Sequence, residues 1–113
     1  MPHVTVEYTD RLDGSHDMQS LCEALYHALA AHPAITHPES LKIRAIPCAF
    51  SRLGTRPQTF AHARLDLLTG RDAATKSSLS ALILATLDAS LPDVGSLSVD
   101  VHDLSPAYTK RVL

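Results

Sequence analysis

Four short segments of the chain alternate between apolar and polar residues. This pattern is typical of half-buried β-strands, because successive side chains of a strand point to opposite faces of the sheet. The segments are residues 3–9, 41–46, 59–68 and 97–102. In the first of them, Val4, Val6 and Tyr8 would share one face. We therefore predict four strands that each bury one side.

Two further segments repeat apolar residues at intervals of three and four, as one face of an amphipathic helix does. They are residues 18–29, after the first strand, and residues 73–91, after the third. Ser15 or Asp17 can cap the first helix and Asp72 the second. Short polar side chains at these positions accept hydrogen bonds from the free N–H groups of a first helical turn.

The order of elements is strand-helix-strand, repeated once, in halves of about residues 2–50 and 58–104. A strand, a helix and a strand in so short a segment favour a parallel crossover within each half. Two helices on one face of a four-stranded sheet make a two-layer sandwich. We therefore predict an α/β fold of the α+β two-layer type, with tandem β-α-β repeats, in one domain over residues 1–113.

The other face of the predicted sheet is polar and carries charges of both signs. Its members are His3, Thr5, Glu7, Lys42, Arg44, His62, Arg64, Asp66, Asp100 and His102. Such a face can be solvated, as in many antiparallel sheets. Alternatively, it can be covered by other subunits, with opposite charges paired across the interface.

Composition and charge argue against nucleic-acid and membrane partners. The formal net charge is −2, so the chain lacks the basic excess typical of proteins that bind nucleic acids or anionic membranes. Aromatic residues make up only 4% and there is no tryptophan, which disfavours base stacking. No signal peptide and no membrane-length apolar segment is evident, and two cysteines are too few for a disulfide framework. We expect a cytoplasmic protein with neither nucleic-acid nor membrane partners.

The seven histidines form no recognisable metal motif. His27 and His32 are five residues apart, which does not place them on one helical face, and the strand histidines lack cysteine or HExxH-type neighbours. Neither a phosphate-binding glycine loop nor a GxSxG nucleophile elbow is present. We therefore expect no metal site.

Two positions carry candidate chemistry, and each also has an ordinary structural explanation. Pro2 becomes a free secondary amine at the end of a strand if Met1 is removed; otherwise it is only a first residue that donates no hydrogen bond. Arg71 follows Gly70 between the third strand and the second helix. There a guanidinium and a helix N-terminus together could bind a carboxylate, or Arg71 could be a surface arginine in a turn.

Three stretches also carry a resemblance to a known family. They are PHVTVEYTD at residues 2–10, LKIRA at residues 41–45 and TFAHARLDLLTGR at residues 59–71. With the doubled strand-helix-strand pattern, they resemble the 5-carboxymethyl-2-hydroxymuconate isomerase family of the tautomerase superfamily. The resemblance implies a homotrimer whose site is completed near subunit contacts, a role in the catabolism of aromatic compounds, and no metal or organic cofactor.

The resemblance also implies roles for individual residues. Pro2 matches the proline whose amine transfers the proton, and Arg71 matches an arginine that binds substrate carboxylate. The family's second site arginine lies in the second strand, where Lys42 is nearest and Arg44 lies two residues on along the same face. The implied reaction is a proton shift in small unsaturated 2-hydroxy or 2-oxo (di)carboxylic acids, such as 5-carboxymethyl-2-hydroxymuconate.

The sequence is also compatible with two alternatives. The same proline could act on another substrate, such as a phenylpyruvate-like enol or a haloacrylate. The chain could also be a non-enzymatic trimeric binding module of the same fold. A retained Met1 would block the Pro2 amine and favour the binding module.

Overall fold

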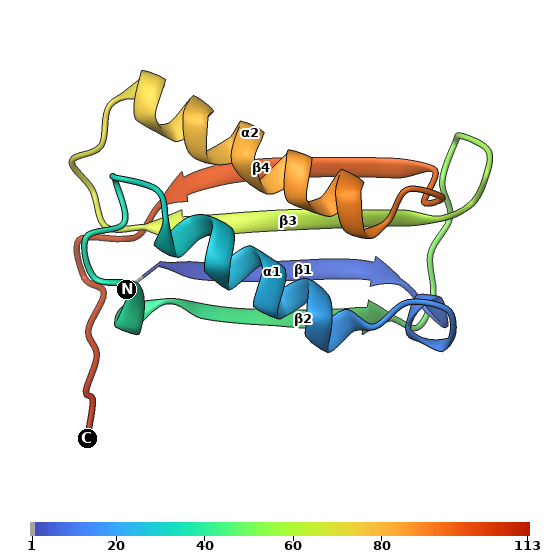
Figure 1. Cartoon of the computed structure of the whole chain (residues 1–113), viewed down its shortest axis with the longest axis horizontal. Coiled ribbons are helices and arrows are strands. Elements are labelled where there is room, and N and C mark those ends of the chain that lie inside the picture. Colours follow the sequence, from blue (N-terminus) through green and yellow to red (C-terminus); the bar gives the residue numbers. More distant parts are fainter. Residues whose placement is uncertain (1) are drawn as a thin grey trace.

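A computed structural model describes residues 2–113 and shows a four-stranded sheet with two long helices (Figure 1). The elements, in chain order, are β1 His3–Thr9, η1 Leu12–Gly14, α1 Met18–Ala30, η2 Pro38–Ser40, β2 Lys42–Cys48, β3 Phe60–Leu67, α2 Ala73–Ser90 and β4 Ser96–Asp103. Every predicted strand and helix is present. β2 continues past the predicted end at residue 46 through Pro47. Proline is tolerated there because β2 is an edge strand.

The strand order is β2-β1-β3-β4. β1 pairs with β2 in parallel and β3 with β4 in parallel, which confirms the predicted crossover in each half. The two halves meet through the antiparallel pair of β1 and β3, in which Val6 lies opposite Ala63. β1 is therefore an inner strand, paired on both sides.

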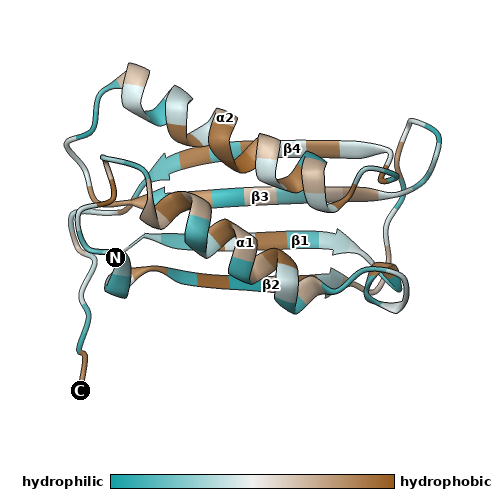
Figure 2. Ribbon diagram, viewed as in Figure 1, coloured by the Kyte–Doolittle hydropathy of each residue, from teal (hydrophilic) through white to brown (hydrophobic). Residues whose placement is uncertain are grey.

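The core lies between the sheet and the two helices, which cover the same face (Figure 2). Val4 and Val6 of β1 are fully buried, as are Leu25 of α1 and Ile83 of α2. Fully burying a side chain of this size stabilises the fold by about 1.5–3 kcal/mol. Hydrophobic burial therefore holds both helices on one face, and neither helix covers the polar face opposite, called the second face below.

Each long helix begins with an aspartate that accepts a backbone hydrogen bond. The Asp17 carboxylate accepts from the N–H of Ser20 at 3.0 Å, and the Asp72 carboxylate accepts from the N–H of Thr75 at 2.8 Å. The backbone bond from Ser20 lowers the pKa of Asp17, and hydrogen bonds from the side chain and the backbone of Thr75 lower the pKa of Asp72. Asp72 thus fixes the first turn of α2 immediately after the β3–α2 connection.

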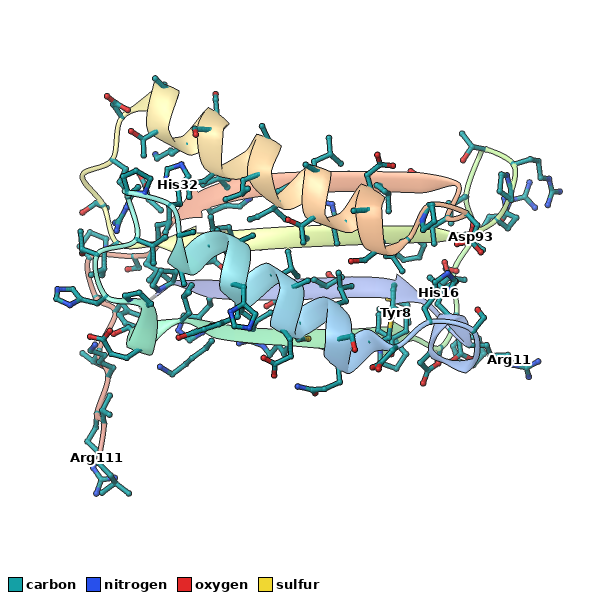
Figure 3. All side chains as sticks on the ribbon, viewed as in Figure 1. Tyr8, Arg11, His16, His32, Asp93 and Arg111 are labelled. Atoms are coloured by element: carbon teal, nitrogen blue, oxygen red, sulfur yellow. The ribbon has the colours of Figure 1, made fainter. Side chains whose placement is uncertain are left out.

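A side-chain hydrogen bond joins two connections at the end of the sheet that lies away from the β3–α2 connection. His16, after η1, and Asp93, in the α2–β4 connection, point toward each other there (Figure 3), with 2.7 Å between His16 Nε2 and an Asp93 carboxylate oxygen. The hydrogen bond to Asp93 raises the pKa of His16. This hydrogen bond therefore connects the segment before α1 with the α2–β4 connection.

The β3–α2 connection depends on Gly70. Its φ of +116° lies in a region that residues with a side chain rarely adopt. No atom lies within 4 Å of the position that a Cβ would occupy. The requirement for glycine is thus conformational rather than steric, and it fixes the direction in which the chain reaches Arg71.

We predict that Gly70→Ala destabilises the protein by about 1–3 kcal/mol, the usual cost of holding a residue in a sparsely populated backbone conformation. The measurement is denaturant unfolding at a fixed protein concentration. Gly14→Ala is the matched control, because Gly14 also has open space around its Cβ position but no positive φ. Equal stability of the two variants would show that the turn does not need glycine.

Candidate active site

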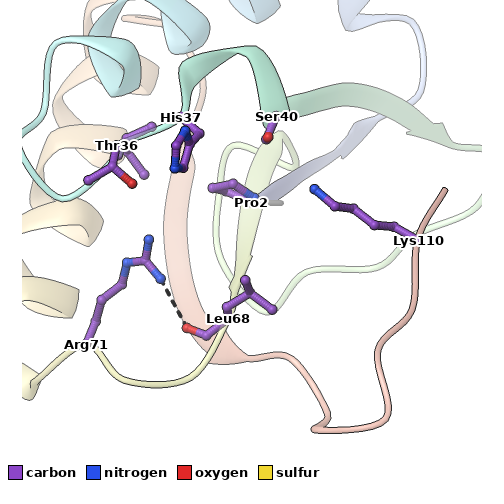
Figure 4. Close-up of a pocket in the computed structure, with 8 residues that line it drawn as sticks. Pro2, Thr36, His37, Ser40, Leu68, Arg71 and Lys110 are labelled. Atoms are coloured by element: carbon purple, nitrogen blue, oxygen red, sulfur yellow. Dashed lines mark hydrogen bonds between the residues drawn. The ribbon is translucent and has the colours of Figure 1, made fainter. Parts of the chain in front are cut away.

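Several connections of the fold meet at the first residue of β1. Because β2 is parallel to β1 and β3 is antiparallel to it, the loop entering β2 and the turn leaving β3 both lie beside this point. The tail leaving β4 starts at the same end of the sheet. A pocket of about 200 Å³ forms there (Figure 4). Its lining residues are Pro2, Ile35, Thr36, His37, Ser40, Leu68, Arg71 and Lys110.

Pro2 lies at the centre of this group in Figure 4 and is buried. Its carbonyl accepts a hydrogen bond of 3.0 Å from the backbone N–H of Lys42. This bond extends the β1–β2 ladder by one residue beyond the first paired position, His3 with Lys42. The backbone of Pro2 is therefore held by the sheet. The removal of Met1 lies outside the described residues.

Arg71 reaches the pocket from the β3–α2 turn and connects two of its walls. Its Nη1 donates to the carbonyl of Leu68 at 3.2 Å, and its Nη2 donates to the carbonyl of Ala34 at 3.1 Å. These two bonds use two of the five N–H donors of the guanidinium. They orient a half-buried cation beside Pro2, a suitable position for binding an anion.

Lys42 and Arg44 do not line this pocket. Both lie exposed on the second face of β2, where Lys42 Nζ donates to the Ser40 carbonyl at 3.5 Å and Arg44 Nη1 lies 3.4 Å from His3 Nδ1. Burial, and then the charges of Arg44 and Lys42, lower the pKa of His3. Within one chain the structure thus brings Pro2 and Arg71 together and keeps the two β2 cations on a separate surface.

Lys110 is a pocket residue that the sequence patterns did not identify. It belongs to the C-terminal tail, which has no regular secondary structure and no hydrophobic period. Figure 4 shows the Lys110 side chain extending toward Pro2 from the side opposite Arg71. The tail packs against the end of the sheet, and this packing brings Lys110 close to Pro2.

Among the described residues, those that line the pocket include cations but no acidic residue. Among residues 2–113, no carboxylate forms an ion pair with Arg71 or Lys110. The lining residue His37 lies 3.4 Å from the exposed carboxylate of Glu39, which does not line the pocket. The arrangement therefore favours a negatively charged ligand.

Other chemistry is not assembled in the described part of the chain. Among residues 2–113, no three His, Cys, Asp or Glu side chains are grouped so that they could hold a metal ion. Burial raises the pKa of the thiols of Cys22 and Cys48, which opposes formation of the nucleophilic thiolate. No helix within residues 2–113 is both long and apolar enough to cross a membrane.

Comparison with known proteins agrees with this architecture. A structure described as a 5-carboxymethyl-2-hydroxymuconate isomerase from Deinococcus radiodurans R1 is 28% identical, with a TM-score of 0.82 over 98% of this chain and 88% of that one. A 5-carboxymethyl-2-hydroxymuconate delta-isomerase is 19% identical, with a TM-score of 0.85 over 99% and 88%. A fused 4-OT symmetric trimer is 19% identical, with a TM-score of 0.72 over 90% and 85%. Comparison with curated proteins gave no significant match.

The family assignment rests on the sequence as well as on the fold. The model of the 5-carboxymethyl-2-hydroxymuconate isomerase family matches residues 2–111, which include Pro2, Arg71 and Lys110. The structures that share the fold include other tautomerase-type proteins. The chain therefore belongs to the 5-carboxymethyl-2-hydroxymuconate isomerase family and is an isomerase with the tautomerase fold.

Proposed function

We propose that this protein is a cofactor-free tautomerase in which the Pro2 amine, freed by removal of Met1, moves a proton within a small unsaturated 2-hydroxy or 2-oxo acid. The observation that carries the proposal is that Pro2 and Arg71 line one pocket without an acidic residue. A substrate related to 5-carboxymethyl-2-hydroxymuconate is favoured by the family to which the chain belongs.

The chemistry needs a base that is neutral near physiological pH. A free α-amine has an ordinary pKa of about 7.7–8.0, far below that of lysine, and a proline amine is somewhat more basic. Burial of Pro2 and the nearby positive charge of Arg71 both disfavour the ammonium form and would lower the pKa of the amine. A base with a pKa close to the working pH typically contributes about 100- to 10,000-fold to the rate.

The proton balance closes within the pocket. The Pro2 nitrogen accepts the proton of the 2-hydroxyl group, and the electron pair of that O–H bond forms the 2-oxo group. The double bonds shift along the substrate, and the carbon that gains electron density takes the proton back from the Pro2 ammonium. No electrons leave the substrate, so no redox partner is needed. Arg71 would bind the carboxylate next to the reacting oxygen, and it would stabilise the negative charge that develops on that oxygen.

We further propose a homotrimer built from one domain with halves at residues 2–50 and 58–104, working in the reducing cytoplasm with Cys22 and Cys48 as free thiols. The fold neighbour described as a symmetric trimer and the mixed-charge second face support this assembly. In a closed trimer, a neighbouring subunit could present Lys42 or Arg44 to the site as its second cationic group. Either residue would have to reach the substrate by this route, because neither lines the pocket of its own chain.

We predict that activity requires the free Pro2 amine. A residue joined in front of Pro2 converts its nitrogen into a tertiary amide, which cannot accept the proton. A protein with an N-terminal extension should therefore lose at least about 100-fold in turnover of 2-hydroxymuconate relative to a protein that starts at Pro2. Ultraviolet absorbance follows the reaction, and mass spectrometry establishes each N-terminus.

Both forms should fold and assemble alike, because proline contributes no N–H to the ladder and is tolerated at the start of a strand. Circular dichroism and sedimentation serve as controls, with a trimer expected for both forms. If the extended trimer turned over at the rate of the free form, Pro2 would not be the base. If neither form turned over any enol acid, including phenylpyruvate, the binding-module alternative would stand.

We predict that Arg71→Ala lowers kcat/KM on carboxylate substrates by at least about tenfold, since a charge-assisted bidentate contact is stronger than a neutral hydrogen bond. Arg71→Lys is the matched variant, since it keeps the charge but loses the planar fork of the guanidinium. Its kcat/KM should lie between those of the parent and of Arg71→Ala. Thermal unfolding of each variant separates this effect from loss of the bonds to Leu68 and Ala34. Parent-like kinetics for Arg71→Ala would make Arg71 only a turn residue.

A further inference from the structure

We propose that Lys110 of the C-terminal tail is a substrate-binding residue that selects ligands with a second carboxylate. The inference rests on the proposed function only for its kinetic consequences. Lys110 lines the pocket that Pro2 and Arg71 share, and it approaches from the opposite side of Pro2 (Figure 4). A ligand centred on Pro2 would therefore have a cation at each end.

The tail is fixed close to Lys110 by a specific contact. The Tyr108 hydroxyl lies 2.9 Å from His3 Nε2, and the two rings meet edge to face at 74° with their centroids 5.8 Å apart. His3 directly follows Pro2 and is the first residue of β1. The Tyr108–His3 contact thus holds the tail, two residues before Lys110, against the start of the strand that follows Pro2.

The tail is further shaped by Ser105. The N–H of Tyr108 donates to the Ser105 carbonyl at 2.9 Å, and the N–H of Ala107 donates to the Ser105 hydroxyl at 3.1 Å. These bonds form a turn after β4 that directs the chain back across the end of the sheet. The approach of Lys110 to the pocket therefore follows from a bonded turn and an aromatic contact.

His3 also links the tail to β2. The lowered pKa of His3 favours its neutral ring. In the neutral ring, Nδ1 can accept from Arg44 at 3.4 Å while Nε2–H donates to Tyr108. A neutral His3 thus satisfies both contacts at once, so the tail is anchored without a charged partner.

The charges around the pocket lack an internal partner. Within residues 2–113, neither Arg71 nor Lys110 pairs with a carboxylate, although other cations of the chain do, as Arg64 with Asp66 and Lys76 with Asp103 show. Arg71 offers a planar fork and Lys110 a point charge. A ligand with one carboxylate needs only Arg71, whereas a ligand with a second carboxylate also engages Lys110.

The decisive variant is Lys110→Gln, and Arg111→Gln is its matched control. Arg111→Gln removes the same charge from the next position of the tail. Arg111 does not line the pocket, and Figure 3 shows it toward the free end of the tail. Kinetics are compared on 2-hydroxymuconate, which has two carboxylates, and on phenylpyruvate, which has one. Thermal midpoints are recorded for all variants.

Lys110→Gln should raise KM for 2-hydroxymuconate about two- to fivefold, within the range for an ion pair that involves an exposed lysine, and leave KM for phenylpyruvate unchanged. Lys110→Arg should restore most of the loss. Tyr108→Phe, which removes the hydroxyl contact to His3 but keeps the ring, should show a smaller loss of the same selectivity. Equal effects of Lys110→Gln and Arg111→Gln, or equal losses on both substrates, would overturn the proposal.

A binding measurement separates this inference from the proposed catalysis. cis,cis-Muconate carries two carboxylates but no enol hydroxyl, so calorimetry can follow its binding without turnover. Binding about two- to fivefold weaker to Lys110→Gln than to the parent and to Arg111→Gln would support the assignment even if no substrate reacted. Equal affinities of all three proteins would refute it even if the Pro2 chemistry were confirmed.

Discussion

The pocket depends on the pairing of β1 with strands on both of its sides. An inner strand cannot shift its first residue without breaking ladder hydrogen bonds to β2 and β3 together. Pro2 precedes that strand, and its carbonyl is bonded to Lys42. The opposite directions of β2 and β3 relative to β1 then bring an entering loop and a leaving turn to the same point. Placement of the candidate site is therefore a consequence of sheet topology.

Electrostatics distinguish this end of the molecule from its polar second face. On the second face, Arg64 pairs with Asp66, and His102 lies 2.6 Å from an Asp100 carboxylate oxygen, so positive and negative groups compensate locally. In the pocket, Arg71 is held by carbonyl oxygens, which orient it but do not neutralise its charge. An orientated, uncompensated cation can act on an anionic ligand and on a neighbouring amine in the same way: it favours negative charge and disfavours positive charge.

Much of the fold was predictable because each element obeys a simple period. Val4, Val6 and Tyr8 alternate along β1, and aspartates stand where α1 and α2 begin. The antiparallel junction of β1 with β3 was not predictable in this way, since it joins segments far apart in the chain. The extension of β2 through Pro47 followed from its edge position, which only the strand order reveals.

The candidate site was partly predictable for the same reason. Gly70 and Arg71 form a recognisable turn, and the structure places Arg71 beside Pro2 in one pocket. Lys42 and Arg44 lie on one face of β2 as the alternation indicated, but alternation cannot tell which surface a substrate uses. No sequence pattern predicts the place of Lys110 in the pocket. Its position depends on the contact of Tyr108 with His3, two residues that are 105 positions apart in the chain.

In the proposed mechanism, a buried amine beside an uncompensated cation serves as the base. The most direct test is a ¹⁵N NMR titration of the Pro2 nitrogen in protein that begins at Pro2, labelled with ¹⁵N-proline. We predict a Pro2 pKa below the 7.7–8.0 of an ordinary α-amine, and a rise in that pKa in Arg71→Ala, where the neighbouring positive charge is gone. A Pro2 amine that titrates at or above the ordinary value, unchanged by loss of Arg71, would contradict it.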